Sequence, residues 1–294
     1  MRSAARVAYA AVIVGMATLL PSRAAAQAER LTAHEVVARI KANIGVPWAE
    51  QTVDTFKDGD PDMPVTGIAV TMMATLDVLQ RAAAAGANLV ISHEPTFYGH
   101  LDQLEPFEQA NDAVTAAKRA FIRDRKLVIV RMHDHWHRRK PDGIETGMIR
   151  ALGWERYQRP ESEFLFTMPA TTLNDLAASI RSRLGAATLR VVGDPTLRVT
   201  NVGVAPGAAG FPAHLLALRR DDVEALVIGE TREWETVEYV DDAVAAGMRK
   251  ALIIVGHIPS EQAGMQEFAR WLEPLVKGTP VTFIAAKEPF WSPK

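Results

Sequence analysis

The sequence of 294 residues contains no cysteine. This absence excludes disulfide bonds, thiol nucleophiles and cysteine-ligated zinc or iron–sulfur sites. A metal site in this chain must therefore use His, Asp and Glu side chains. The folded state must be stabilised by its core, by bound metal or by assembly.

The chain also lacks a basic excess and several common catalytic motifs. The formal net charge of −2 gives no indication of a nucleic-acid-binding surface. There is no GxSxG nucleophile elbow, no GxGxxG after a predicted strand and no P-loop motif. The stretch DTFKDGDPD resembles a calcium loop only in composition, because the EF-hand spacing is missing. We predict a solvated loop for its acidic residues Asp54, Asp58, Asp60 and Asp62.

The first 28 residues have the layout of a secretory signal peptide. Arg2 and Arg6 form a basic segment, the apolar run 7–20 follows, and small residues allow cleavage near Ala26 or Ala28. An uncleaved membrane anchor is the alternative, but the apolar run is too short to span a bilayer comfortably. We expect a periplasmic or secreted protein that is free of the membrane after cleavage.

Strand and helix patterns alternate along the rest of the chain, which predicts an α/β fold with largely parallel sheet cores. In an N-terminal half, 29–154, the strands are predicted at 65–70, 88–92 and 126–132, and the helices at 32–42, 75–86, 106–124 and 142–153. In a C-terminal half, 198–294, the strands are predicted at 199–204, 225–229, 250–256 and 281–286, and the helices near 212–220, 233–246 and 260–276. Residues 155–197 are predicted to form a small α+β insert between the halves.

The two halves repeat each other in sequence. VTGIAV at 65 matches VTNVGV at 199, NLVISHE at 88 matches ALVIGE at 225, and KLVIVRMH at 126 matches KALIIVGH at 250. The polar residues at the strand ends match as well as the apolar ones. This pattern predicts two pseudo-repeated halves that pack together around a site.

Polar side chains follow the predicted strands where these end. His93 and Glu94 follow one strand, HDHWH at 133–137 follows the next, Glu230 follows a third, and His257 with Glu261 follow a fourth. Functional groups in open parallel sheets gather beyond the carboxyl ends of the strands, so we expect these residues to converge. Imidazoles and carboxylates without thiols suit Zn, Fe, Mn or Co. The predicted ligands are His93, Glu94, His133, His137, His257 and Glu261.

Two alternatives stay open at this point. His257 and Glu261 also fit the start of a helix with Ser260 as N-cap. HDHWH precedes Arg138, Arg139 and Lys140, so a solvated loop could hold some of its members. Within HDHWH the register favours His137 as the ligand, and the chemistry favours Asp134 next.

Three segments resemble one family. NLVISHEPTFY resembles the LI-(S/T)HHP-L-F segment of the Nif-three-like family of dinuclear metal-centre hexameric proteins, often called GTP cyclohydrolase I type 2 homologues. IIVGHIPSEQAGMQEFARWL resembles that family's GH-x-x-SE-x-x-G segment, and LVIGE resembles its YITGE strand. The resemblance covers residues 33 to 286 and includes the layout of two halves with an inserted small domain.

The resemblance implies two metal ions between the halves, with His93, His257 and Glu261 as ligands and Glu261 bridging. The chain departs from the family at two positions. Glu94 replaces a second His, as in a branch that reads HEPTFY, and His137 replaces the Asp of HTNLD. An imidazole does not bridge two metals in the usual way. Glu94 or Asp134 would then bridge, or the site would differ in metal number or spacing. The resemblance also implies a homohexamer.

The favoured function is metal-dependent hydrolysis of a phosphoester, cyclic amide or related small molecule, with two metal ions per chain. Glu230, Asp134 or His135 would be the general acid or base. An exported protein would rarely meet GTP. The alternatives are a metal- or ligand-binding scaffold without turnover, and a periplasmic metal buffer that uses HDHWH alone.

Overall fold

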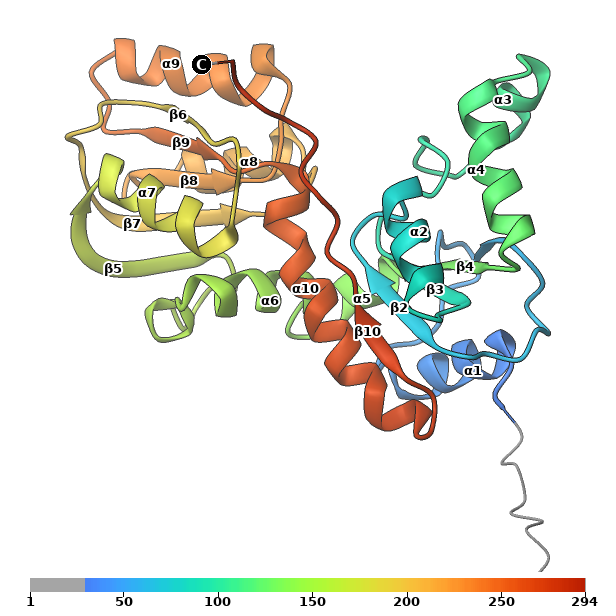
Figure 1. Cartoon of the computed structure of the whole chain (residues 1–294). Coiled ribbons are helices and arrows are strands. Elements are labelled where there is room, and N and C mark those ends of the chain that lie inside the picture. Colours follow the sequence, from blue (N-terminus) through green and yellow to red (C-terminus); the bar gives the residue numbers. More distant parts are fainter. Residues whose placement is uncertain (1–29, 294) are drawn as a thin grey trace, which may run out of the picture.

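A computed structural model describes residues 30–293 of the chain. The predicted signal peptide, 1–28, lies outside this part. Strands and helices alternate along the described residues and form two five-stranded sheets, each covered by helices (Figure 1). This arrangement confirms the predicted α/β fold. Within the described residues, no helix combines the length and the apolar content needed to cross a membrane.

The first sheet has the strand order β1-β4-β3-β2-β10. Its strands are β1 (Phe56–Asp58), β2 (Ile68–Thr71), β3 (Leu89–Ser92), β4 (Val128–Arg131) and β10 (Val281–Phe283). All neighbours are parallel except β1 and β4. Every residue of β2, β3 and β4 is buried, which explains why each strand begins with three consecutive apolar residues without alternation. The strands end in Thr71, Ser92 and Arg131.

Helices cover both faces of the first sheet. On one face lie α1 (Ala33–Asn43) and α10 (His257–Leu272), and on the other lie α2 (Leu76–Ala84) and α4 (Ala113–Asp124). A capping box formed by Thr32 and Glu35 starts α1. The predicted helix 106–124 is wrong in one respect, because it is divided into α3 (Glu105–Gln109) and α4. Asn111 between them has a φ of 51°, and Asp112 caps α4.

The second sheet has the order β5-β7-β8-β9-β6. Its strands are β5 (Leu165–Thr172), β6 (Arg190–Val192), β7 (Arg198–Ala205), β8 (Ala225–Ile228) and β9 (Ala251–Ile254). The three central strands are parallel, and the two edge strands are antiparallel to them. Residues 155–197, predicted as an insert, supply both edge strands and α7 (Leu173–Leu184), which packs in the core of this sheet.

The remaining helices complete the two layers around the second sheet. One face carries α6 (Gly143–Leu152) and α7, and the other carries α8 (Phe211–Leu218) and α9 (Glu238–Ala245). Shorter turns are α5 (Asp134–Arg138), η1 (Glu155–Tyr157), η2 (Glu233–Val237) and η3 (Glu273–Val276). The predicted helix 260–276 begins three residues earlier, at His257, so Ser260 is not its N-cap.

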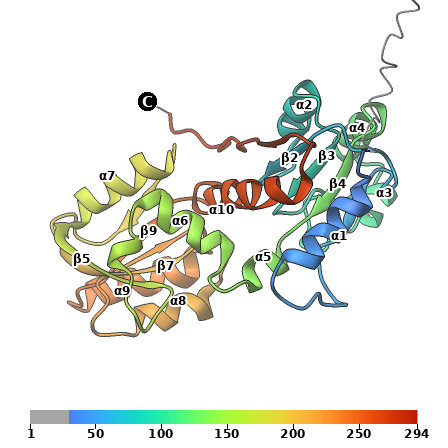
Figure 2. The same ribbon diagram turned by 90° about the horizontal axis from the view of Figure 1, so that it is seen from below.

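Two helices cross between the sheets and hold the halves together. α10 comes from the C-terminal half but packs Met265, Phe268 and Leu272 into the core of the first sheet. α6 comes from the N-terminal half but packs into the core of the second. The two helices lie side by side (Figure 2). A Cβ atom on Gly147 of α6 would lie 2.4 Å from the Gly264 Cα atom of α10, so this close approach requires glycine.

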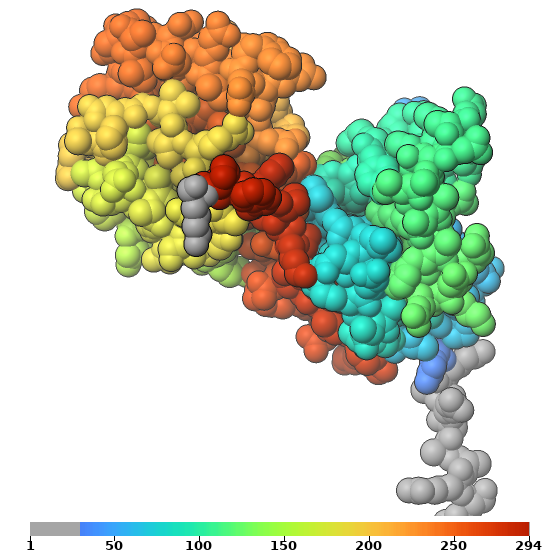
Figure 3. All heavy atoms as spheres, turned by 45° about the horizontal axis from the view of Figure 1, so that its top comes forward, coloured from blue at the N-terminus to red at the C-terminus, as the bar shows by residue number. Residues whose placement is uncertain are grey.

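The C-terminal residues return to the first sheet and then cross back. β10 pairs in parallel with β2, although the two strands are far apart in sequence. Beyond β10, the Glu288 carboxylate accepts hydrogen bonds from the backbone N–H groups of Ala187 and Thr188 in the second half. The space-filling view shows this segment crossing the base of a hollow between the halves (Figure 3). Sheet membership therefore does not follow the order of the chain.

Candidate metal centre

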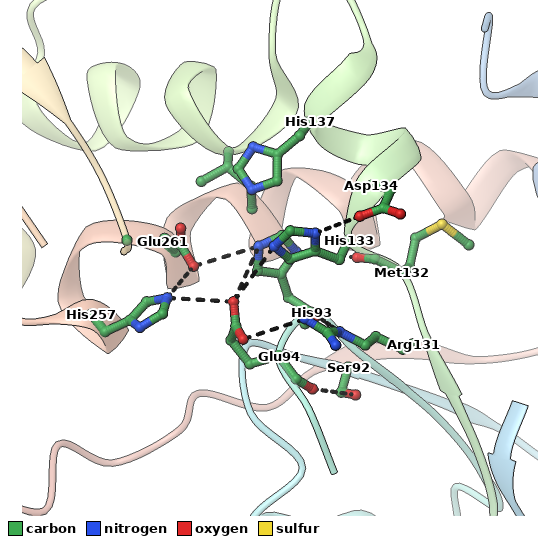
Figure 4. A network of polar contacts seen from close by, with 12 residues as sticks. Ser92, His93, Glu94, Arg131, Met132, His133, Asp134, His137, His257 and Glu261 are labelled. Carbon is green, nitrogen blue, oxygen red and sulfur yellow. Dashed lines mark hydrogen bonds and ion pairs between the residues drawn. The ribbon is translucent and has the colours of Figure 1, made fainter. Parts of the chain in front are cut away.

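The carboxyl ends of three parallel strands bring the predicted ligands together (Figure 4). His93 and Glu94 directly follow β3. His133 precedes α5 and His137 lies on it, just beyond β4. After β9, His257 is the first residue of α10 and Glu261 lies one turn further on. The predicted convergence is therefore present, and the cluster lies between the two sheets.

Each of the four imidazoles has a partner for its Nδ1 atom and turns its Nε2 atom toward the cluster (Figure 4). The Nδ1 partners are Met132 O for His93 at 3.1 Å, Asp134 Oδ1 for His133 at 3.0 Å, Asp142 Oδ2 for His137 at 2.8 Å and Glu230 Oε1 for His257 at 3.4 Å. Metal-binding histidines are held in the same way, because a carbonyl or carboxylate on one ring nitrogen fixes the tautomer and the ring orientation.

Two buried carboxylates lie among the Nε2 atoms. Glu94 Oε1 is 3.4 Å from His257 Nε2, 3.8 Å from His133 Nε2 and 3.9 Å from His93 Nε2. Glu261 Oε2 is 3.0 Å from His257 Nε2 and 3.5 Å from His93 Nε2. Ligand atoms that bind one metal ion at about 2.0–2.2 Å lie only a few ångströms from one another, as these carboxylate oxygens and imidazole nitrogens do.

Two overlapping groups of side chains could hold a metal ion. One is His93, His133 and His137, and the other is His93, Glu94 and Glu261, with ligand atoms within 4.8 Å of one another in each group. His93 Nε2 is buried and has no hydrogen-bond partner among the described residues. An unpaired buried polar atom is costly, and a metal ion would satisfy it. These residues fit a divalent ion.

The protonation states support the same interpretation. Burial, together with the nearby His133 and His137, holds the pKa of His93 well below its usual range, so its imidazole is neutral as metal binding requires. Burial raises the pKa of Glu94, but its contacts with His257, His93 and His133 outweigh burial and lower the pKa to about 2. Glu94 is therefore a carboxylate at neutral pH.

His257 balances the charge of the carboxylates. Burial lowers its pKa, but hydrogen bonds with Glu230, Glu261 and Glu94 outweigh burial and raise the pKa to about 12. A proton on His257 thus neutralises part of the negative charge of the cluster. A bound cation would take over this role.

The motifs and the fold also identify the family. A family model for Duf34/NIF3 (NGG1p interacting factor 3) matches residues 29–289. The chain belongs to this family. The resemblance predicted from the strand-end motifs is thereby confirmed.

Solved structures share the fold of this NIF3-family chain at low sequence identity. The hypothetical protein SA1388 of Staphylococcus aureus is 16% identical, with a TM-score of 0.69 over 90% of this chain and 99% of that one. A Bacillus cereus protein related to NIF3 is 14% identical, with a TM-score of 0.68 over 90% and 99%. TTHA1606 of Thermus thermophilus is 16% identical, with a TM-score of 0.59 over 88% and 100%. A comparison with curated proteins finds no match.

Asp134, predicted as a catalytic residue, lies behind His133 in this NIF3-family chain and away from the Nε2 atoms (Figure 4). Its Oδ1 atom is the partner of His133 Nδ1, and its Oδ2 atom accepts hydrogen bonds from Thr52 Oγ1 at 2.8 Å and Val53 N at 3.2 Å. Both oxygens are therefore occupied. Glu230, the other predicted catalytic residue, lies on the outer side of His257 and is partly exposed.

His135 turns away from the cluster. Its Nδ1 atom lies 2.6 Å from Asp54 Oδ2, its Nε2 atom accepts a hydrogen bond from Ala49 N at 2.9 Å, and its ring stacks on Trp48 at 3.7 Å. The solvated loop predicted for Asp54 is wrong, because this residue is only 3% exposed. Its carboxylate accepts hydrogen bonds from the N–H groups of residues 133, 134 and 135. Asp54 therefore holds the start of α5.

The sequence motifs missed three further residues near the cluster. Arg131 ends β4 and is fully buried; its Nε atom donates to His93 O at 2.9 Å, and its Nη2 atom lies 3.5 Å from Glu94 Oε2. His100 and Glu145 line the cavity beside the ligands. Burial, together with Asp142 and Glu163, raises the pKa of Glu145 to about 7. A charged residue inside an apolar strand was the available signal for Arg131.

The ligands lie between two cavities. The smaller, of about 430 Å³, is lined by Glu94, His133, His137 and Glu261 together with residues of the second half. The larger, of about 1330 Å³, lies on the Glu230 side of the centre and is lined in part by the C-terminal segment 288–292. His257 lines both cavities. A ligand in either cavity could therefore contact the cluster.

Proposed function

We propose that the protein is a metal-dependent hydrolase with two divalent ions, Zn, Fe, Mn or Co, held between its halves. The observation that carries the proposal is the set of four imidazoles whose Nδ1 atoms are held and whose Nε2 atoms surround two buried carboxylates. The ligands would be His93, Glu94, His133, His137, His257 and Glu261. Glu94 is the better choice for a bridging carboxylate than Asp134, because Glu94 Oε1 faces three imidazoles.

When bound, the ions would lower the pKa of a water molecule and so supply a hydrolytic nucleophile at neutral pH. The protein's own residues would orient the ligands and move protons. Asp134 and Asp142 hold His133 and His137 in position. Glu230 borders the larger cavity, and its hydrogen bond with His257 lowers its pKa, so it is a carboxylate that can accept a proton.

The test begins with elemental analysis of the purified protein, followed by a screen of phosphomonoesters, phosphodiesters, esters and cyclic amides. We expect close to two ions per chain, and turnover that is lost on chelation and in His257→Ala. In protein saturated with metal, Glu230→Gln should still lower the rate about 100-fold, because saturation offsets any loss of metal affinity caused by its contact with His257. Glu233→Gln is the control, because Glu233 is an exposed partner of Arg190. Turnover that survives both chelation and His257→Ala would contradict the proposal.

The same screen separates the alternatives. Bound metal without turnover on any substrate class would indicate a metal- or ligand-binding scaffold. A buffer that uses HDHWH alone predicts that deletion of 133–137 removes all metal and that His93→Ala removes none. The position of His93 in both candidate ligand groups argues against this buffer.

Assembly and location remain predictions. A homohexamer would be detected by light scattering of the purified protein. Export would be tested by the N-terminal sequence of the mature chain, which we expect to begin just after Ala26 or Ala28.

A further inference from the structure

The smaller cavity has two unlike sides. The metal ligands form one side. The other side comes from Phe164, directly before β5, and from the end of β7, the loop that follows it and α8, whose residues include Pro206, Ala208, Ala209, Ala213 and Leu216. All of these side chains are apolar, and three of them are the small methyl group of alanine. Such a side offers packing surface and no hydrogen-bonding side chain.

The loop after β7, which forms part of this apolar side, is held against the candidate metal centre by its backbone. A Cβ atom on Gly207 would lie 1.9 Å from Glu261 Oε1, so the loop requires glycine in order to pass the carboxylate. Gly207 N also donates a hydrogen bond to Ser260 Oγ at 3.0 Å, and Ser260 Oγ donates to His257 O at 2.7 Å. The apolar side of the cavity is therefore held at a fixed distance from the candidate metal ligands.

The cavity is poorly suited to an anionic group. Among the described residues, no lysine or arginine lines it. Arginine and lysine are the usual partners of phosphate in proteins. Its ionisable lining residues besides the ligands are His100 and Glu145, and the nearby Lys140 pairs with Glu163 rather than with Glu145. Outside the candidate ligand set, therefore, no described side chain of this lining offers a permanent positive charge to an anionic group.

We propose that this cavity binds the uncharged, apolar part of the substrate while the polar reacting end reaches the metal centre. This inference rests on the proposed hydrolase function and narrows it to a small amide or ester that carries a ring or short aliphatic group, and it disfavours a phosphoester. A volume of about 430 Å³ lies near the lower end of the range of ligand pockets and admits a molecule with one ring.

The test uses two metal-binding probes that differ only in their apolar group, acetohydroxamate and benzohydroxamate. Their affinities for the metal-loaded protein are measured by calorimetry. We expect benzohydroxamate to bind at least tenfold more tightly. Ala213→Leu should remove this difference by filling the cavity and should leave acetohydroxamate unchanged. Ala245→Leu is the control, because it makes the same change at an exposed residue of α9 that lies outside both cavities. It should alter neither affinity.

Equal affinities of the two hydroxamates for the unsubstituted protein would overturn the inference. Phenyl phosphate that binds more tightly than benzohydroxamate would also overturn it. A protein that takes up no metal would contradict the proposed function instead. The cavity would then be tested with benzamide by saturation-transfer NMR. A signal that Ala213→Leu removes would support the apolar subsite, and no signal would overturn it.

Discussion

The Nδ1 atom of His137 lies 2.8 Å from the Oδ2 atom of Asp142, the residue whose Oδ1 atom caps α6. One carboxylate therefore starts a helix and also orients an imidazole of the candidate metal centre. Because α6 packs against α10, which carries His257 and Glu261, the geometry of the cluster depends on the contact between these two helices.

Substitution of Asp142 by Asn should weaken metal binding about 10- to 100-fold. The amide oxygen can still cap α6, but the amide NH₂ cannot accept the His137 proton. Metal affinity is measured by competition with a chromophoric chelator. Asp112→Asn is the control, because Asp112 caps α4 through Thr115 and holds no imidazole. An equal loss of metal affinity in both variants would show that Asp142 does not orient His137.

Asp54→Asn should lower the free energy of unfolding by about 2–4 kcal/mol. The carboxylate faces the N–H groups that start α5 and the Nδ1 atom of His135, and an amide NH₂ would oppose one of these donors. The quantity is measured by urea unfolding of metal-free protein. Asp60→Asn, at an exposed position in the same acidic stretch, should change it by less than about 0.5 kcal/mol. A similar small effect for Asp54 would contradict its structural role.

Much of this arrangement could be predicted from the sequence. The buried parallel strands are short apolar runs, and the residues that follow them reach one region because parallel strands end at the same edge of a sheet. Thr32, Thr75, Asp142 and Thr172 also cap helices, as Ser, Thr, Asp and Asn commonly do. These features depend on neighbouring residues alone.

The choice within HDHWH could not be made without the element that carries it. Residues 134–138 form a helical turn, so His133 and His137 are four positions apart and lie on the same side, whereas His135 points elsewhere. If this stretch is interpreted as a loop, its sequence does not show which side chains lie on the same side. Once the turn is known, helical periodicity alone selects His133 and His137.

Contacts between distant segments also escaped prediction. Asp54 is 79 residues from His133 in sequence, and its acidic surroundings resemble an exposed loop. β10 pairs with β2, and Gly147 packs on Gly264, only because α6 and α10 cross between the sheets. Such contacts depend on the packing of whole elements, which local patterns do not encode.

Gly147→Ala should destabilise the protein by about 1–3 kcal/mol, because the new methyl group would overlap the backbone of α10 and push the helices apart. The same shift should weaken metal binding, since α10 carries His257 and Glu261. Both quantities are measured on the purified variant. Gly99→Ala has no atom within 4 Å of the added group and should leave stability unchanged. Tolerance of Gly147→Ala would contradict the close helix contact.

Lys118 should make the free energy of unfolding depend on pH in the alkaline range. It is buried, and its Nζ atom donates to Thr96 O; burial lowers its pKa from 10.5 to about 8. Below pH 8 both states hold the proton and the folded state bears the burial cost. Between pH 8 and 10.5 the unfolded state binds more protons, so stability rises with pH, by at most about 3 kcal/mol.

The measurement for Lys118 is the free energy of unfolding of the unsubstituted protein minus that of Lys118→Met, at several pH values. This difference should become more favourable to the unsubstituted protein as the pH rises from 8 to 10.5. Because Lys118→Met lacks the titrating group, the subtraction cancels the pH dependence that both proteins share through their other residues. A difference that does not change over this range would show that Lys118 titrates normally.

Removal of metal should separate the two kinds of histidine in this site. A ligand that binds only the folded state at 100 times its Kd stabilises it by about 2.7 kcal/mol, so chelation should lower the melting temperature. His93→Gln should melt at the same temperature with and without chelator, because its unpaired Nε2 atom faces the cluster. His135→Gln should be less stable overall but should keep the full response to chelator, because both of its ring nitrogens are bonded within the protein. The opposite pattern would assign the metal to His135 and contradict the ligand set.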